Sequence, residues 1–295
     1  MSYRETTFTS DGVVCSAWHF AGSGPAPRPV VVMAHGFAGT KDSGLEPFAE
    51  RFADAGFDVL AFDFRGFGSS EGTPRQSISV VRQLRDYESA IAAAKLLPGV
   101  DPDRIVLWGV SLSGGHVIRV AADRDDVRAV IALTPLTDPV ATARGILKQY
   151  KLSAAGRATV EGLVSRVAVA RGRNPVMMPV VGRPGEPGGL TLDGAYENYH
   201  AIAGPTWRNE VDAAVGQELM KISTKSYAKR LRARLLVQIA DFDSYVPADA
   251  VARTAEYGRG WVHHYPCDHF DVWPGLDWFD RAVSDQVAFL RKVFG

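Results

Sequence analysis

The segment 109–115, Gly-Val-Ser-Leu-Ser-Gly-Gly, has the residue types and spacing of a turn that presents a reactive serine. It lies where an apolar, strand-like run passes directly into a helix-like stretch. So sharp a turn crowds the positions two before and two after its apex, and both are small here, Gly109 and Ser113. Ser113 replaces the second glycine of the Gly-x-Ser-x-Gly pattern and still meets the steric requirement. The pattern predicts that Ser111 stands at the apex as a nucleophile.

A serine that attacks a carbonyl carbon needs hydrogen-bond donors for the oxyanion that forms beside it. The amide of Leu112 opens the helix after Ser111 and is predicted to point at that position. A second donor is expected in the segment 35–39, His-Gly-Phe-Ala-Gly, which ends an earlier apolar run. The Phe37 amide is the candidate there, although a glycine-rich turn that only ends a strand gives the same sequence.

A base and an acid are sought later in the chain, in the order serine, acid, histidine. Asp241 and Asp243 follow one late apolar run, and His269 follows the last one. His269 would take the proton of Ser111 during attack and return it to the leaving group, while a buried carboxylate fixes its tautomer. Asp138, which follows an earlier apolar run, is kept as a reserve acid.

These residues must be positioned by the elements around them. Over residues 1–135, β-branched runs alternate with helix-like stretches, which is typical of a mostly parallel sheet covered on both faces. Residues 3–9 and 13–20 alternate in polarity on either side of Ser-Asp-Gly and predict an antiparallel hairpin. The expected central strands span 30–34, 58–64, 104–110 and 127–133, and the expected helices span 46–55, 79–97 and 112–122.

The alternation stops after Pro135 and resumes near residue 229. Between them, residues 136–228 carry helix-like stretches that are broken by a loop rich in proline and glycine. We interpret this segment as an inserted helical cap, and residues 1–135 and 229–295 as one α/β core. The expected elements of the second core part are strands at 235–240 and 261–266 and helices at 248–257 and 277–293.

Five strings resemble motifs of the α/β-hydrolase superfamily and lie in both parts of the core. They are His-Gly-Phe at 35–37, Asp-Phe-Arg-Gly-Phe-Gly-Ser-Ser at 63–70, the segment 109–115, Asp-Ser-Tyr-Val-Pro at 243–247 and His-Phe-Asp at 269–271. The resemblance implies an α/β-hydrolase fold, with a mostly parallel sheet of about eight strands, helices on both faces and an inserted cap. It also implies a catalytic triad of Ser111, Asp243 and His269.

Within this superfamily, the Ser-x-Ser-Gly-Gly-His elbow and the His-Phe-Asp string are similar to the branch of Xaa-Pro dipeptidyl-peptidases and bacterial acyl esterases. In that pattern the acid lies four residues before a proline. With Pro247 in that place, the resemblance selects Asp243 over Asp241.

Other polar residues near these motifs have a structural interpretation. Asp63, Arg65 and the glycines that follow are expected to form a loop shaped by turns and an ion pair. Cys267 is expected to be a small buried residue because no elbow presents its thiol. The His and Asp residues of 263–271 lack a helical i, i+4 pair, so we expect no metal. The acyl chemistry requires no cofactor.

The predicted cap contains several large apolar side chains that would line an apolar substrate pocket over Ser111. The same residues would also serve as the core of the cap itself, and sequence alone does not separate the two roles. They are Met177, Met178, Tyr196, Tyr199 and Trp207.

Composition limits the classes of partner. The 295 residues carry 33 basic and 33 acidic side chains, and this balance gives no electrostatic reason to expect a nucleic acid. No run approaches the roughly 18 apolar residues of a membrane span, and residues 1–12 are too polar for a secretory signal. The two cysteines, far apart, form no disulfide framework. We therefore expect no membrane partner and a cytoplasmic protein, and leave a homodimer open.

The function that these residues favour is hydrolysis of a carboxylic ester of a small molecule through an acyl-enzyme on Ser111. A serine at the elbow argues against dehalogenase and epoxide hydrolase chemistry, where a carboxylate attacks carbon. Three alternatives stay open: a dipeptidyl-peptidase-like amide hydrolase, a thioesterase or carbon–carbon bond hydrolase, and a non-catalytic binding protein that keeps the fold.

Overall fold

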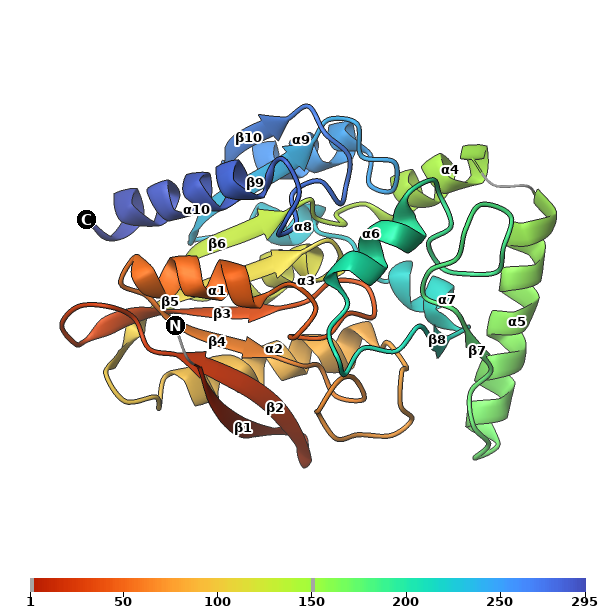
Figure 1. The fold of residues 1–295 in the computed structure, drawn as a ribbon, viewed down its shortest axis with the longest axis horizontal. Helices are drawn as coiled ribbons and strands as arrows, with labels where there is room; N and C mark the ends of the chain where they lie inside the picture. Colours follow the sequence, from red (N-terminus) through yellow and green to blue (C-terminus); the bar gives the residue numbers. More distant parts are fainter. Residues whose placement is uncertain (1–2, 150–151) are drawn as a thin grey trace.

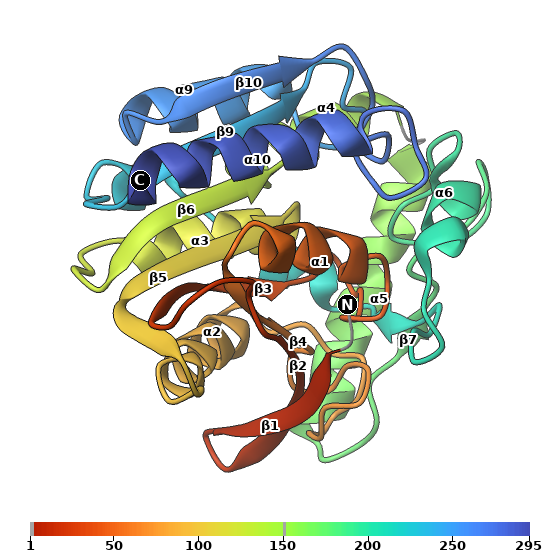
Figure 2. The ribbon, with the colours of Figure 1, turned by 60° about the vertical axis from the view of Figure 1, so that its left-hand side comes forward.

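The fold is built on one eight-stranded sheet, drawn in two views in Figures 1 and 2. The computed structural model describes residues 3–149 and 152–295. The sheet order is β1-β2-β4-β3-β5-β6-β9-β10; the β1–β2 and β2–β4 pairs are antiparallel and the others are parallel. The strands are β1 (Arg4–Ser10), β2 (Val13–Phe20), β3 (Arg28–Ala34), β4 (Asp58–Phe62), β5 (Val100–Val110), β6 (Val127–Leu133), β9 (Arg234–Ala240) and β10 (Trp261–Tyr265).

Burial follows the two kinds of strand pattern in the sequence. Every residue of β4 is buried, and so is every residue of β3 after Arg28, because helices cover both faces of the sheet there. In β1, at the edge of the sheet, only Phe8 and Ser10 are buried. The mostly parallel, eight-stranded α/β architecture predicted from the sequence is therefore confirmed.

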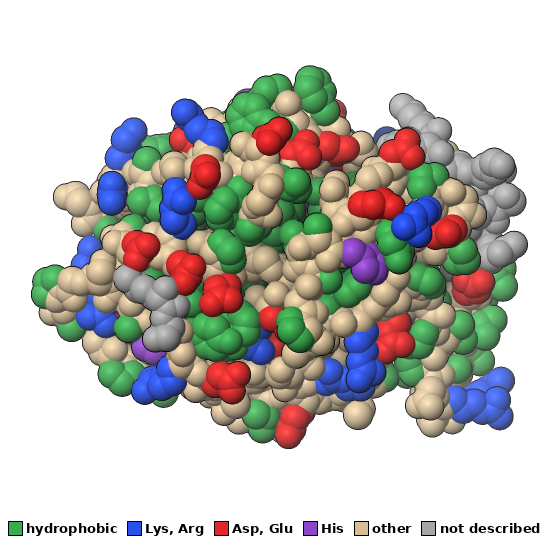
Figure 3. Space-filling view, viewed as in Figure 1, with side chains coloured by type: hydrophobic (Ala, Val, Ile, Leu, Met, Phe, Trp, Pro, Cys, Tyr) green, Lys and Arg blue, Asp and Glu red, His purple; other side chains and the backbone are tan. Residues whose placement is uncertain are grey.

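Helices cover the sheet on both sides. The helix α1 (Glu46–Asp54) packs against α10 (Phe279–Phe294) on one face, while α2 (Val80–Ala94), α3 (Leu112–Ala121) and α9 (Ala248–Tyr257) lie on the other (Figure 2). The helix α1 is amphipathic and buries Phe48 and Phe52, one helical turn apart, whereas nearly every residue of α3 is buried. On the face drawn in Figure 3, acidic and basic side chains are interspersed, in line with their equal numbers.

The segment 136–228, here called the insertion, connects the neighbouring strands β6 and β9, and most of its described part lies beyond the carboxyl ends of the parallel strands (Figure 1). The last helix of this segment, α8 (Lys225–Ala228), packs against α3 and α9 of the core. Of the described helices, none combines the length and apolarity needed to cross a membrane. The elements are α4 (Pro139–Gln149), α5 (Leu152–Ala170), β7 (Met177–Met178), α6 (Ala195–Ile202), β8 (Val211–Asp212), α7 (Val215–Leu219) and α8 (Lys225–Ala228).

Most of the boundaries expected from the sequence agree with the structure within two residues, and two differ by three or more. The helix expected over 79–97 ends at Ala94 and passes into a turn before Pro98. The strand expected from residue 104 begins at Val100, where it pairs with Arg28 of β3 before a register shift. Neither difference moves the carboxyl ends of the strands, which carry the predicted site.

Candidate active site

Ser111 lies between β5 and α3 in a backbone conformation that side chains rarely adopt, with φ 53° and ψ −115°. A non-glycine residue persists in such a conformation only where its surroundings fix it. The Ser111 amide donates to the Leu133 carbonyl at 2.9 Å, and the Ser111 carbonyl accepts from the Leu136 amide at 2.8 Å. Ser111 itself is half-buried. The strand-to-helix turn predicted from the sequence is thus present.

The small residues around Ser111 are required by backbone contacts. A Cβ added at Gly109 would lie 2.3 Å from the Ser113 carbonyl oxygen, and one added at Gly115 would lie 2.3 Å from the Leu136 carbonyl oxygen. Ser113 also has a polar role, because its hydroxyl accepts from the Val110 amide at 2.8 Å and lies 2.9 Å from the Ala34 carbonyl oxygen. A serine therefore replaces glycine here and joins the turn to β3.

His269 and Asp243 are joined by a short hydrogen bond from the loops that follow β10 and β9. His269 Nδ1 lies 2.6 Å from Asp243 Oδ2, and the two side chains are 7% and 3% exposed. The other carboxylate oxygen of Asp243 accepts from the amides of Tyr245 at 2.8 Å and Val246 at 2.7 Å. The carboxylate is thus fixed by its own loop and presents one oxygen to the imidazole.

Charge decides the protonation of this histidine. Burial opposes the charged form, but the Asp243 carboxylate, assisted by Asp268, outweighs it and holds the pKa of His269 above its ordinary value. Asp268 also orders the loop, because its Oδ1 accepts from the amides of Ser244 at 2.9 Å and His269 at 2.6 Å. Among the described residues, the Ser111 hydroxyl makes no hydrogen bond to His269; such bonds are often long before substrate binds.

The two other candidates for the acid, Asp241 and Asp138, form hydrogen bonds with other groups. Asp241 Oδ1 lies 2.6 Å from His264 Nδ1 on the partly exposed edge of β10. Asp138 accepts from the amides of Val140 and Ala141, both at 3.0 Å, and so caps the start of α4. The structure therefore brings His269 together with Asp243, the carboxylate that the family resemblance selects.

The loop after β3, residues 35–43, is organised around a buried histidine. The Gly36 amide donates to His35 Nδ1 at 2.8 Å, so His35 Nε2 carries the proton and donates to the Ser43 carbonyl at 2.9 Å. Burial lowers the pKa of His35 to about 4, which keeps the ring neutral. A Cβ added at Gly36 would lie 3.1 Å from the Ser111 Cβ, so the loop passes directly beside the serine.

The two predicted oxyanion donors are the amides of the residues that follow Gly36 and Ser111. Phe37 follows Gly36 in the loop, and Leu112 follows Ser111 at the start of α3. Within the described part of the chain, neither of their amides has a backbone or side-chain acceptor. The geometry leaves both N–H groups available beside Ser111, which is what stabilisation of an oxyanion requires.

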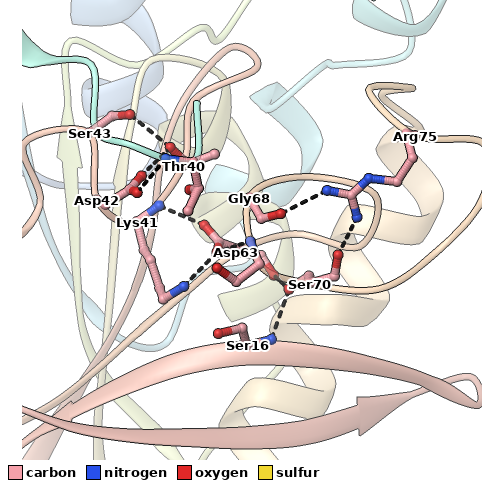
Figure 4. Close-up of polar contacts among 11 residues, drawn as sticks. Ser16, Thr40, Lys41, Asp42, Ser43, Asp63, Gly68, Ser70 and Arg75 are labelled. Atoms are coloured by element: carbon pink, nitrogen blue, oxygen red, sulfur yellow. Dashed lines mark hydrogen bonds and ion pairs between the residues drawn. The ribbon is translucent and has the colours of Figure 1, made fainter. Parts of the chain in front are cut away.

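A buried ion pair anchors the same loop to the core, as Figure 4 shows. Lys41 Nζ lies 2.7 Å from Asp63 Oδ2, and the Lys41 amide donates to Asp63 Oδ1 at 2.6 Å. Asp63 also accepts from the Ser69 amide at 3.0 Å, and its carbonyl accepts from the Ser70 hydroxyl at 2.7 Å. Ser70 in turn accepts from the Ser16 amide of β2 at 2.8 Å. The Asp63 loop is therefore structural, as expected, with Lys41 as the cation.

Arg65, the cation nearest Asp63 in sequence, pairs elsewhere. Its guanidinium lies 2.6 Å from Asp86 of α2. Lys41 gives no sequence signal of burial, since a lysine in a polar loop is ordinarily exposed. Cys267 is buried, as expected. His116, in the helix that follows the elbow, is also buried, and burial lowers its pKa to about 3.

The apolar residues expected to form a substrate pocket in the insertion differ in exposure. Met177 is 37% exposed in β7, whereas Tyr199 is 3% exposed. Met178, Tyr196 and Trp207 are partly buried against the hydrophobic core. Four of the five therefore pack inward, as a core of the insertion would, and their contact with substrate stays a prediction. In the ranges that the structure describes, no group of three or more His, Cys, Asp or Glu side chains suits a metal ion.

Comparison with known proteins gives two kinds of relative. Residues 25–259 match the family described as serine aminopeptidase, S33. A quorum-quenching protein, AidA, of Acinetobacter baumannii is 34% identical over 292 residues, covering 98% of this chain and 94% of that protein. A thiohydrolase, apmlB, of Arthrinium phaeospermum is 31% identical and covers 97% of this chain and 95% of that protein.

The fold has counterparts among solved structures. The crystal structure of the α/β-hydrolase GrgF from a Penicillium species superposes with a TM-score of 0.82. That match has 22% sequence identity and covers 99% of each chain. At this identity the likeness shows the fold alone.

Proposed function

Since the chain belongs to the serine aminopeptidase S33 family of the α/β-hydrolase superfamily, we propose that it is a serine hydrolase that cleaves a carboxylic ester of a small molecule. One observation carries the proposal: Ser111 occupies the strained apex of the elbow, beside the free amides of Phe37 and Leu112. The hydrogen-bonded pair of His269 and Asp243 supports it with a buried base of raised pKa.

The proposed reaction has two balanced halves. In the first, Ser111 Oγ attacks the acyl carbon, His269 takes the hydroxyl proton, and the amides of Phe37 and Leu112 stabilise the oxyanion. The carbon–oxygen bond to the alcohol then breaks, and His269 returns the proton to the departing alcohol. In the second half, water attacks the acyl-enzyme and gives a proton to His269; the bond between the acyl carbon and Ser111 Oγ then breaks, His269 returns the proton to Oγ, and the carboxylic acid leaves. No cofactor or metal takes part.

Asp212, a buried carboxylate of the insertion, is not available to hold the free amine of a peptide substrate. An aminopeptidase needs an unpaired acidic group to hold the substrate amine. Asp212 already accepts from the hydroxyls of Ser165 at 2.6 Å and Ser77 at 2.9 Å and from the Ala214 amide at 2.9 Å. Kinship with the Xaa-Pro dipeptidyl-peptidase branch stays a prediction, as do a homodimer and the cytoplasm.

A thioester is the second candidate substrate. The relative from Arthrinium phaeospermum is named a thiohydrolase and covers nearly the whole chain. The same residues would attack a thioester, with a thiolate in place of the alkoxide as the leaving group. Because a thiolate leaves without prior protonation more readily than an alkoxide, a thioesterase would depend less on His269 as the acid.

The test is labelling with a fluorophosphonate, read by intact mass and peptide mapping. Wild type is compared with Ser111→Ala and with Ser284→Ala, which alters an exposed serine on α10. We expect one adduct, on Ser111, in wild type and Ser284→Ala only. On matched p-nitrophenyl ester, thioester and anilide substrates, Ser111→Ala should lower kcat by about 10⁴-fold or more.

The alternatives make different predictions in this assay. Higher kcat/KM on the thioester than on the matched ester would replace the ester proposal with the thioesterase. Turnover of the anilide alone would favour the peptidase. If folded wild-type protein forms no adduct and turns over none of these substrates, the serine hydrolase proposal fails and the non-catalytic binding protein takes its place.

A further inference from the structure

Tyr199 is the point at which the insertion reaches the loop that carries the Phe37 amide. Its hydroxyl donates to the Phe37 carbonyl at 2.5 Å, and the side chain is 3% exposed. Its ring stacks on Trp207, with centroids 5.1 Å apart and planes at 28°, and meets Phe270 edge-on at 6.0 Å. Burial raises the pKa of Tyr199 well above its ordinary value, so the hydroxyl keeps its proton and remains a donor.

Phe37 is held on a second side by the insertion. A Cβ added at Gly189 would lie 2.9 Å from the Phe37 ring, so the backbone of Gly189 packs directly on that ring. The ring is buried, and the next residue, Ala38, has a left-handed φ of 51°. Such a conformation in alanine costs about 1 kcal/mol or more and needs support from its surroundings.

The helix that carries Tyr199 is itself tied to the same loop. Beyond the end of α6, the Thr206 amide donates to Asp42 Oδ2 at 2.9 Å, and the Gly204 amide lies 3.3 Å from the Ser43 hydroxyl. There is no space for a side chain at Gly204, where a Cβ would lie 2.4 Å from Asp42 Cγ. The insertion therefore contacts the loop 35–43 at both of its ends.

These contacts bear on the direction of one N–H group. Rotation about the two backbone bonds of Phe37 decides where its amide points relative to the rest of the loop. The Gly36 amide, one peptide unit before that of Phe37, donates to His35, and the Phe37 carbonyl, one unit after it, accepts from the Tyr199 hydroxyl. With the ring also held, the Phe37 amide keeps one direction, as stabilisation of an oxyanion requires.

We propose that Tyr199 is a positioning residue of the oxyanion hole, through which the insertion fixes the Phe37 amide beside Ser111. The inference rests on the serine hydrolase function proposed above. It gives Tyr199 a role different from the substrate contact expected from the sequence, because the hydroxyl is committed to the Phe37 carbonyl. The oxyanion hole is then complete only while the insertion is seated on the loop.

The main test is Tyr199→Phe, which removes one hydroxyl and keeps the ring that stacks on Trp207. Loss of a direct oxyanion donor costs about 10²–10³-fold in kcat, so loss of its support should cost less, about tenfold. We expect KM to stay within about twofold. The inhibition constant of a trifluoromethyl ketone, which forms a tetrahedral oxyanion with the serine, should rise by the same factor as kcat falls.

Two further variants keep the result interpretable. Tyr257→Phe removes a tyrosine hydroxyl at the end of α9, outside the insertion, and should match wild type. Gly189→Ala presses on Phe37 from the other side and should also lower kcat with KM unchanged. Near-ultraviolet circular dichroism and thermal midpoints establish that each variant is folded.

The outcomes separate this inference from the function on which it rests. Unchanged kcat and inhibition constant in folded Tyr199→Phe would overturn the positioning role while leaving the hydrolase intact. A raised KM with unchanged kcat would overturn it in favour of substrate contact. A lower thermal midpoint with full activity of the folded protein would reduce Tyr199 to a structural residue. If wild type itself shows no Ser111 adduct and no turnover, the proposed function has failed and this inference with it.

Discussion

Two buried histidines lie in loops at the same end of the sheet and differ in what faces them. His35, after β3, bonds the Gly36 amide and the Ser43 carbonyl, and burial lowers its pKa to about 4. His269, after β10, bonds the Asp243 carboxylate, and its pKa is raised although it is equally enclosed. The loops also touch, because the His35 ring stacks on Trp273 with centroids 4.9 Å apart.

Burial lowers the pKa of both rings, and they differ because His269 faces a carboxylate whose charge outweighs burial. Neutral backbone groups on both nitrogens make His35 a rigid brace for its loop. A carboxylate on one nitrogen makes His269 a base and leaves the other nitrogen for chemistry. The loop of His35 does hold a buried charge, Lys41, but that charge is matched by Asp63.

The strongest test of the difference between His269 and His35 is Asp243→Asn, which removes the negative charge that faces His269. We expect kcat to fall by about 10⁴-fold, because the imidazolium loses its stabilisation and the tautomer is no longer fixed. The pKa of His269, followed by NMR, should fall toward the depressed range of His35.

Asp241→Asn is the matched control, since it alters a more exposed aspartate two residues away that bonds His264. It should change kcat by less than about twofold, as expected for a surface pair. Equal losses in the two variants would contradict the assignment of Asp243.

A second prediction concerns the matched charge in the loop of His35. Lys41→Ala leaves the Asp63 carboxylate buried and without its cation, which should lower the free energy of unfolding by about 3–5 kcal/mol. Urea unfolding measures this. Lys95→Ala is the control, because its partner Asp126 is partly exposed and keeps Arg124; it should cost at most about 1 kcal/mol. Similar losses would mean that the buried pair contributes no more than a surface pair.

The third prediction uses pH, where the two histidines act in opposite directions. The unfolded chain takes up a proton on His35 near pH 6.5, whereas the folded protein does so only near pH 4. Stability from His35 is therefore lost as pH falls from about 6.5 to 4, by about 3 kcal/mol at most. Stability from His269 is present below pH 6.5 and is lost as pH rises through its raised value.

His35→Asn, which does not ionise, should flatten the fall in urea midpoint between about pH 6.5 and 4. By contrast, kcat/KM should begin to decline above pH 6.5, as pH drops through the raised pKa of His269, in both wild type and this variant. An unchanged slope in His35→Asn would mean that His35 does not carry the acid sensitivity.

Much of the fold follows from the order of residue types along the chain. The runs at β3 and β4 are apolar throughout because both faces of the sheet are covered, and that pattern marks central strands. The elbow is also readable, because sterics demand small residues at Gly109 and Ser113. The start of β5 and the end of α2 differ by a few residues from those predicted, because the ends of helices and strands depend on contacts with other parts of the chain.

The polar partners of the site were harder to infer. Sequence order placed Asp243 and His269 in late loops, but family resemblance was needed to prefer Asp243 over Asp241. No pattern in the sequence around Lys41 predicts that it is buried and paired with Asp63. The contact of Tyr199 with Phe37 joins residues 162 positions apart, and no local pattern encodes a bond of that range.

The sequence by itself determined the alternating sheet, the serine turn and the chain order of the candidate groups, because period, size and turn chemistry are local properties. Tertiary structure alone decided which carboxylate faces His269, which cation meets Asp63 and which hydroxyl of the insertion reaches Phe37. Each of those choices depends on distance and burial between segments that are remote in the chain, where the energy of a hydrogen bond or ion pair is set by its surroundings.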